Sequence, residues 1–384
     1  MKEQTDYQGF EQGQIRPPSE ADSLLIRVTR NCPWNHCTFC PVYKGSKFSL
    51  RSKEHVIKDI DAAWEHVEKL RHAAGTDGMI SHEDIRNLSI NLDAGKSRAF
   101  YAAIHWLRGG MKSIFIQDAN SLVIKPSDLI EILKHLKMRF PFVERITSYA
   151  RSQTIAKIKD SDLEAIHKAG LNRIHIGMES GSDKVLERVK KGTSKQTQIK
   201  AGVKIKRAGM ELSEYVMPGL GGQDLSKEHA LETADALNQI NADFIRLRTL
   251  AIPDNIPLFA QYESGAFKKC TDFMMAEEIL LFIDNLSGIG SMIKSDHILN
   301  LFQEIEGKLP EDKAYMTGIL HAFIDMPSKQ RYMYQAGRRL GIFSALSDME
   351  DLQRMAKVES ICQENNITEK NADQVIDELM RRFI

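Results

Sequence analysis

Three of the five cysteines, Cys32, Cys37 and Cys40, lie within nine residues at the spacing C-x4-C-x2-C. They follow the apolar segment 24–28, so one short loop carries all three thiols. Thiolates this close in sequence can bind one centre, and soft sulfur ligands favour zinc or an iron–sulfur cluster. Three protein ligands leave one coordination position open, as a reactive metal site requires. The spacing therefore predicts metal-centred chemistry.

A structural zinc site is the main alternative from the residues alone. Such a site needs four ligands. His36 could be the fourth, but it adjoins Cys37, and adjacent residues rarely both reach one ion. In a reducing compartment, clustered cysteines more often bind metals or act as redox thiols than form disulfides. Zinc and an iron–sulfur cluster both stay open at this point.

The composition is that of an ordinary globular protein, with 42% hydrophobic and 27% charged residues. The 52 basic and 52 acidic residues cancel, so bulk charge does not favour a nucleic-acid partner. No apolar run reaches the ~18 residues of a membrane span, and the polar start does not resemble a signal peptide. We expect a cytoplasmic protein with no membrane or nucleic-acid partner.

The elements that must position the cysteine loop form a regular series. Short apolar stretches alternate with amphipathic segments that end at glycine or a turn. The predicted strands are 24–29, 113–116, 145–149, 173–177, 211–217 and 244–248, and the main helices are one capped by Ser52 and those at 100–107, 126–138, 161–169, 196–208 and 227–240. This alternation indicates a parallel sheet with right-handed crossovers. We predict an α/β fold: a partial (β/α)6 TIM-like barrel with a C-terminal helical region.

Three domains follow from this pattern. Residues 1–21 are expected to form a loose N-terminal arm, 22–256 the partial barrel, and 257–384 a mostly helical C-terminal cap. The cap is expected to contain helices at 276–286, 313–324, 330–340 and 349–365, interrupted by turns at 294–297 and 307–312.

Polar residues recur where the predicted strands end. Reactive groups of such folds collect at the carboxyl ends of the strands. The cysteines follow the first strand, and the later strand ends carry Gln117, Asp118, Ser148, Arg151, Glu179, Ser180, Pro218 and Gly219. We therefore predict one site ringed by strand ends.

In these motifs the chain resembles the radical S-adenosylmethionine (radical SAM) enzymes. The cysteine loop is similar to their C-x3-C-x2-C, although its first gap has four residues, and the aromatic Phe39 precedes the last cysteine. Residues 115–119 stand where the family contacts the methionine amino group. Residues 176–183 and 216–222 resemble the Gly-x-(Glu/Gln)-Ser-Gly and Gly-Leu-Pro-Gly segments of the branch with coproporphyrinogen III dehydrogenase, the methylthiotransferases and the elongator-type enzymes.

The resemblance implies a [4Fe–4S] cluster held by Cys32, Cys37 and Cys40, with S-adenosylmethionine (SAM) on the fourth iron. Reductive cleavage of SAM would then give a 5′-deoxyadenosyl radical that abstracts a substrate hydrogen atom, with flavodoxin or ferredoxin as electron donor. The implied cofactor contacts are Phe39, Gln117, Asp118, Ala119, Ser148, Arg151, Glu179, Lys191, Tyr215 and Leu250. Lys191 would pair with the methionine carboxylate, or it is simply a solvated lysine.

Two pairs of residues are candidates for the substrate side. Arg246 and Arg248 share one face of the sixth strand, because side chains alternate along a strand. They could hold an anionic substrate or the cofactor carboxylate, or pair with helix carboxylates outside the barrel. Asp296 and His297 could line the mouth and move protons, or form a structural hydrogen bond.

Three functions are consistent with these residues and motifs. The first is a radical SAM enzyme that acts on a small organic substrate. The second is radical modification of a peptide or an RNA, and the neutral charge argues against RNA. The third is a non-catalytic zinc-binding module. Cys270 and Cys362 stand alone and cannot supply a second cluster.

Overall fold

The computed structural model describes residues 6–75 and 80–381, which form two compact units. The first unit comprises Met1–Asn35, Gly45–Ile176 and Lys204–Glu211. The second comprises His36–Lys44, Gly177–Val203 and Leu212–Ile384. Strand β6 (Arg173–Glu179) belongs to both units, because the division falls after Ile176.

The strands form a mostly parallel sheet. In the first unit β1 (Leu24–Arg27), β4 (Ser113–Gln117), β5 (Arg145–Tyr149) and β6 pair in parallel in that order. In the second unit β7 (Glu211–Val216), β8 (Phe244–Leu247) and β9 (Met292–Lys294) pair in parallel, and β10 (Gly307–Lys308) pairs antiparallel with β9. Among the described residues the order β1-β4-β5-β6-β7-β8-β9-β10 is that of an eight-stranded sheet. The α/β class and the barrel-like strand order are confirmed.

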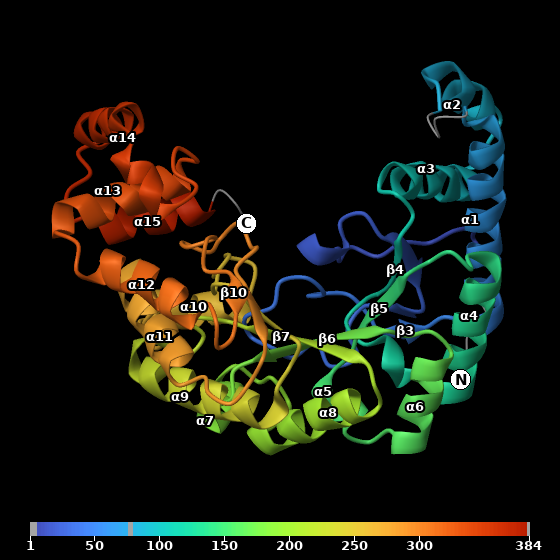
Figure 1. Cartoon of the computed structure of the whole chain (residues 1–384), viewed down its shortest axis with the longest axis horizontal. Helices are drawn as coiled ribbons and strands as arrows, with labels where there is room; N and C mark the ends of the chain where they lie inside the picture. The colour runs from blue at the N-terminus through green and yellow to red at the C-terminus, as the bar shows by residue number, and fades with distance from the viewer. Residues whose placement is uncertain (1–5, 76–79, 382–384) are drawn as a thin grey trace. The chain divides into compact units, whose positions relative to one another are not determined.

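Helices of the first unit cover its strands. Helix α1 (Lys53–Ala73) begins as predicted at Ser52, whose side chain accepts a hydrogen bond from the His55 N–H. It packs against α3 (Ala94–Arg108) and α4 (Pro126–Arg139), as Figure 1 also shows. The remaining elements of this unit are η1 (Pro18–Glu20), β2 (Thr29–Arg30), β3 (Ser49–Leu50), α2 (His82–Ser89), η2 (Ser121–Val123), α5 (Ser152–Ile155) and α6 (Asp160–Lys168).

Residues 7–20, expected to be loose, bind to the first unit. The Phe10 side chain is 1% exposed, and the Tyr7 hydroxyl donates to Asp59 Oδ1 at 2.9 Å. The Gly13 N–H donates to Gln117 Oε1 at 2.7 Å. The polar residues of the arm are therefore used in specific contacts, which composition alone does not reveal.

The second unit is richer in helices. Helix α11 (Asp272–Asp284) packs against α9 (Gly222–Ile240) and α12 (Lys313–Ile324), so it lies between them in Figure 1. The other helices are α7 (Asp183–Arg188), α10 (Pro257–Glu263), α13 (Ser328–Arg339), η3 (Leu346–Glu350), α14 (Leu352–Glu364) and α15 (Ala372–Arg381). Helix α8 (Lys195–Arg207) belongs to this unit up to Val203 and to the first unit from Lys204 on. All four helices expected in the C-terminal region are present, shifted by a few residues.

The six expected strands are found to within two residues at either end. Strand β9 ends at Lys294, where the expected turn 294–297 begins, and β10 lies at the start of the expected turn 307–312, so the sheet continues beyond residue 257. They have three and two residues and owe their strand conformation to pairing. A strand this short carries almost no periodicity.

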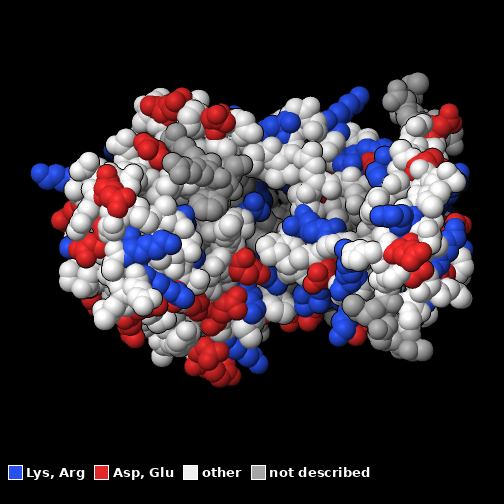
Figure 2. All heavy atoms as spheres, turned by 90° about the horizontal axis from the view of Figure 1, so that it is seen from above, with Lys and Arg blue, Asp and Glu red and all other residues white. Residues whose placement is uncertain are grey.

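Charges of both signs are intermixed on the face drawn in Figure 2. This agrees with the equal numbers of basic and acidic residues. Within the described ranges, no helix is both long and apolar enough to cross a membrane.

Candidate functional site

The cysteine loop is shared between the two units, with Cys32 in the first and Cys37 and Cys40 in the second. None of the three cysteines forms a disulfide, and all three are partly exposed. The Cys32 sulfur accepts the Asn35 N–H at 3.4 Å. In the second unit the Thr38 N–H donates to the Val189 carbonyl at 2.9 Å, and the Thr38 carbonyl accepts the Leu258 N–H at 3.0 Å. The middle of the loop is thus fixed by backbone bonds on both sides.

An apolar cluster supports the second half of the loop. Phe39 is 7% exposed and packs in a group with Val189, Met217 and Leu250, against which Cys37 and Cys40 are partly buried. Partly buried thiols outside any disulfide, beside apolar side chains, suit a soft metal centre. Within the described residues, no group of three or more His, Cys, Asp or Glu side chains is gathered closely enough to hold a metal ion. Thiol donors fit an iron–sulfur cluster by their chemistry, but the assignment of Cys32, Cys37 and Cys40 as its ligands depends on their spacing in the sequence.

The end of β4 binds the N-terminal arm. Gln117 Nε2 donates to the carbonyls of Gly13 and Ile15, at 3.2 and 2.8 Å. Asp118 is fully buried, has a φ of 72°, and accepts Arg27 Nε at 2.6 Å. Both side chains are thus engaged within the first unit, which leaves the backbone of residues 117–119 as the group they can present.

Glu11 of the arm gathers three arginines. Its carboxylate lies 2.7 Å from Arg27, 2.8 Å from Arg30 and 3.5 Å from Arg51. Burial alone would raise the pKa of Glu11, but the hydrogen bond from Arg30 and the three positive charges lower it below the ordinary value. Arg30 stands two residues before Cys32, so this cluster anchors the root of the cysteine loop. Sequence reasoning missed Glu11.

The end of β5 carries two predicted cofactor contacts, Ser148 and Arg151, which differ in their surroundings. Ser148 is fully buried, and its register places it with Ile116 and Ile174. Its hydroxyl donates to the Ile116 carbonyl at 3.4 Å and the Tyr149 carbonyl at 3.2 Å. Arg151 lies 5.0 Å from the ring of Trp34, a residue of the cysteine loop. Of these two predicted residues, Arg151 is the one beside the loop.

The end of β6 joins Phe39, Glu179 and Lys191. Lys191 Nζ lies 3.0 Å from Glu179 Oε1 and 5.7 Å from the centre of the Phe39 ring. Both ionic side chains are 13% exposed, so Lys191 is not a solvated lysine. Gly177 makes room for the pair, since a Cβ there would lie 2.3 Å from Glu179 Oε1. The structure thus brings three predicted cofactor residues together.

A buried histidine fixes the segments that follow β6 and β7. His229 lies 2.8 Å from Ser180 Oγ through Nδ1, and 3.0 Å from the Met217 carbonyl through Nε2. Glu278 Oε1 accepts the Gly219 N–H at 2.7 Å. Neither His229 nor Glu278 has a sequence signal that marks it.

Strand β7 carries the predicted Tyr215 and an unexpected acid. Tyr215 pairs in register with Arg246, whereas Glu214 pairs with Ile245. Glu214 is fully buried, and neither carboxylate oxygen has a hydrogen-bond partner among the described residues. Burial raises its pKa well above the ordinary value, with Lys191 opposing and Glu179 adding to the shift.

The predicted substrate residues lie together in the second unit. Arg246 is 5% exposed, donates from Nε to Ser213 Oγ at 3.2 Å, and pairs with Asp296. Its partner is a carboxylate of the turn after β9, not of an outer helix. Arg248 is exposed. Burial and the Arg248 charge lower the pKa of His297 to about 4.

Residues 26–234, more than half of the chain, match the family described as the Radical SAM superfamily. A tRNA uridine(34) acetyltransferase of Methanocaldococcus infernus is 23% identical over 110 residues, 28% of this chain and 21% of that protein. A 4′-phospho-dehydrooxetanocin synthase of Priestia megaterium is 27% identical over 231 residues, 56% of this chain and 26% of that protein.

Among solved structures, coproporphyrinogen III oxidase (HemN) from Escherichia coli has a TM-score of 0.44 at 13% identity. That comparison covers 69% of this chain and 52% of the other. The matches with the two curated relatives cover about a quarter of their length or less.

Proposed function

This chain belongs to the radical SAM superfamily, and from that premise we propose that it abstracts a hydrogen atom from a small organic substrate. Members of this superfamily use a [4Fe–4S] cluster and SAM. When bound, these groups supply the electron and the sulfonium whose C–S cleavage gives methionine and a 5′-deoxyadenosyl radical. This chemistry would remove one hydrogen atom from the substrate and leave 5′-deoxyadenosine as the second product.

Cys32, Cys37 and Cys40 would hold the cluster. Their spacing within the matched residues is the observation that carries this proposal. The absence of a disulfide at these thiols and the apolar cluster around Phe39 support it, because burial keeps water from a reactive centre. Cys270 and Cys362 are buried elsewhere in the second unit and are not needed.

The Glu179–Lys191 pair would receive the amino-acid end of SAM. That end carries an ammonium and a carboxylate, so it offers each member of the pair an opposite charge. Phe39 lies beside Lys191 and would face the adenosyl part. Tyr215 and Leu250, in the same unit, would also contact the cofactor.

In the first unit the backbone of Gln117, Asp118 and Ala119 would contact the methionine amino group. Arg151, beside Trp34, would contact the cofactor from the β5 end. The hydroxyl of Ser148 is bonded to backbone carbonyls, so we expect it to support this strand end.

The substrate is expected to be a small molecule. Equal numbers of acidic and basic residues give no long-range attraction for RNA. Arg246, Arg248, Asp296 and His297 would lie on the substrate side. A flavodoxin or ferredoxin is the expected electron donor.

Electron paramagnetic resonance tests this proposal on protein reconstituted without oxygen and reduced with dithionite. We expect a reduced-cluster signal that shifts when SAM is added, and 5′-deoxyadenosine as product. Cys37→Ala should lose the signal, and Cys270→Ala, a matched control, should keep it. A signal indifferent to SAM, or bound zinc in place of iron, would refute the proposal.

A further inference from the structure

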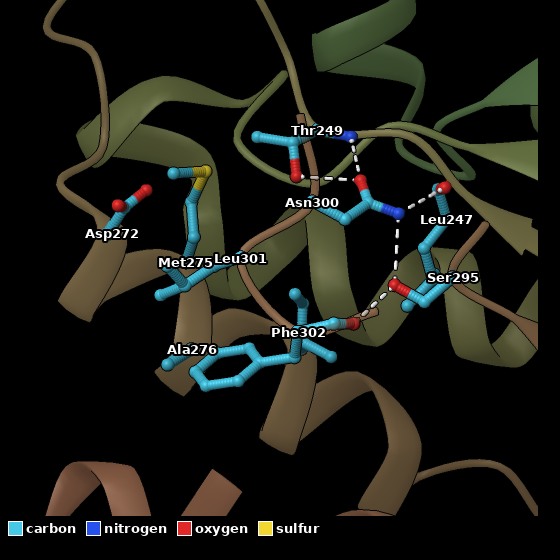
Figure 3. A pocket seen from close by; sticks show the side chains of 10 residues that line it. Leu247, Thr249, Asp272, Met275, Ala276, Ser295, Asn300, Leu301 and Phe302 are labelled. Carbon is cyan, nitrogen blue, oxygen red and sulfur yellow. Dashed lines mark hydrogen bonds between the residues drawn. The ribbon is translucent and has the colours of Figure 1, made fainter. Parts of the chain in front are cut away.

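Asn300 clamps the end of β8 to the turn after β9, as Figure 3 shows. Its Oδ1 accepts the Thr249 N–H at 2.9 Å and the Thr249 hydroxyl at 3.0 Å. Its Nδ2 donates to the Leu247 carbonyl at 2.8 Å and to Ser295 Oγ at 3.0 Å. Asn300 is 3% exposed, so these bonds hold two chain segments in a fixed arrangement.

Arg248 lies between the two residues of β8's end that Asn300 binds. Leu247 and Thr249, on either side, are buried and line the small apolar pocket of Figure 3. Arg248 is exposed, and the alternation of side chains along an extended segment assigns it to the same face as Arg246, two residues earlier.

The clamp also brings His297 to this place. The parallel register pairs Arg246 with Lys294 at the last paired position of β8 and β9, and Arg248 and Asp296 each follow two residues further along the chain. His297 follows directly, and its carbonyl accepts the Asn300 N–H at 3.0 Å. The positive charge of Arg248 accordingly acts on His297.

The neighbouring charges are already balanced, but that of Arg248 is not. Arg246 pairs with Asp296, and Lys294 pairs with Glu306 at 2.7 Å. Within the described ranges, Arg248 makes no ion pair. An exposed arginine with no counter-ion, on the face of a paired arginine, is suited to bind an anion from solution.

His297 can add a neutral donor to this cation. Its Nδ1 accepts the Leu299 N–H at 3.3 Å, which places the ring proton on Nε2. Because burial and Arg248 lower the pKa of His297 to about 4, the ring is uncharged at neutral pH and does not supply a proton. It therefore suits a binding role better than acid catalysis.

We propose that Arg248 and His297 form the anchor for an anionic group, a phosphate or a carboxylate, of the substrate. Arg248 supplies the charge and a planar set of donors, and His297 Nε2 supplies one further N–H. Arg246 then has a positioning role, since Asp296 neutralises it. The identity of the anion as part of the substrate rests on the proposed function, whereas the binding site itself does not.

Nuclear magnetic resonance of the full chain with labelled histidine tests the site. Inorganic phosphate and acetate are added separately, and the His297 signal is identified by its loss in His297→Gln. We expect one of the two anions to shift this signal and to raise the pKa of His297. The anion that binds identifies the group as phosphate or carboxylate.

Arg248→Gln should weaken this binding about 10- to 100-fold, the range for a charged hydrogen bond. Arg86→Gln, a change of an exposed arginine on α2, should leave it unchanged. Binding that survives Arg248→Gln, an equal loss in Arg86→Gln, or no response to either anion would overturn the proposal. These measurements need neither cluster nor SAM, so their failure is distinguishable from failure of the proposed function.

Discussion

The strongest structural prediction concerns Glu11, which holds the N-terminal arm against the root of the cysteine loop. Glu11→Gln removes the negative charge shared by Arg27, Arg30 and Arg51. Breaking a fully buried ion pair costs about 3–5 kcal/mol. The Glu11 side chain is 25% exposed, and Asp118 and Asp59 still pair with Arg27 and Arg51.

The cost should therefore fall to about 2 kcal/mol, within the range of a charged hydrogen bond. That difference increases the population of the detached arm roughly 30-fold. Hydrogen exchange at residues 7–20 measures this population. Glu131→Gln is the matched control, because Glu131 is 57% exposed and pairs only at the surface with Lys53.

The lowered pKa of Glu11 also predicts how binding of the arm depends on pH. The pKa of Glu11 is lowered in the folded chain, so its stabilising effect is full above the ordinary value of 4.5 and is lost as the pH falls through the lowered value. Acid should release the arm in the wild type, and much less so in Glu11→Gln. Equal exchange of residues 7–20 in both proteins at pH 7 would refute the reasoning.

Three further predictions concern the second unit. Glu214→Gln should stabilise the protein by about 1–3 kcal/mol. The stabilisation should grow as the pH rises above 4.5, because the raised pKa of Glu214 means that the wild-type carboxyl group lowers the free energy of unfolding in that range. Urea unfolding at pH 5 and 8 measures this, and a loss of stability at pH 8 would contradict it. Lys191→Met should weaken SAM binding about 10- to 100-fold by equilibrium dialysis, with the exposed Lys190→Met as control; equal affinities would argue against the carboxylate contact. Gly177→Ala should displace Glu179 from Lys191, because the added Cβ would lie 2.3 Å from its Oε1; we expect the same affinity loss as in Lys191→Met, and unchanged binding would show that the pair is dispensable.

Much of the fold could be predicted because each long strand is an apolar run set between helices of clear periodicity. Ile114–Ile116 and Ile174–Ile176 are fully buried or nearly so, as such runs require. Strand β9 could not be predicted, because Met292–Lys294 is a strand only through its pairing with β8. The expectation of a loose arm is wrong for another reason, since Tyr7 and Gly13 are half-buried and bind residues from later in the chain.

The site was partly predictable for a similar reason. Spacing marks Cys32, Cys37 and Cys40, and motif position marks Glu179 and Lys191, which the structure pairs. Spacing says nothing of a residue that acts through a distant partner. Glu11, His229 and Asn300 each hold a strand end through bonds to residues far away in sequence, and each lies outside any local pattern.

The bound arm has a consequence for protein synthesis. Ser19 contacts His175, which is 156 residues further along the chain. The hydrogen bond from the Gly13 N–H also requires a distant residue, Gln117. A ribosome adds about 5–20 residues per second, so the arm remains without its last partner for roughly ten to thirty seconds after it is made. During that interval the arm lacks its contacts with β4 and β6, so it completes its packing only after these strands have been made.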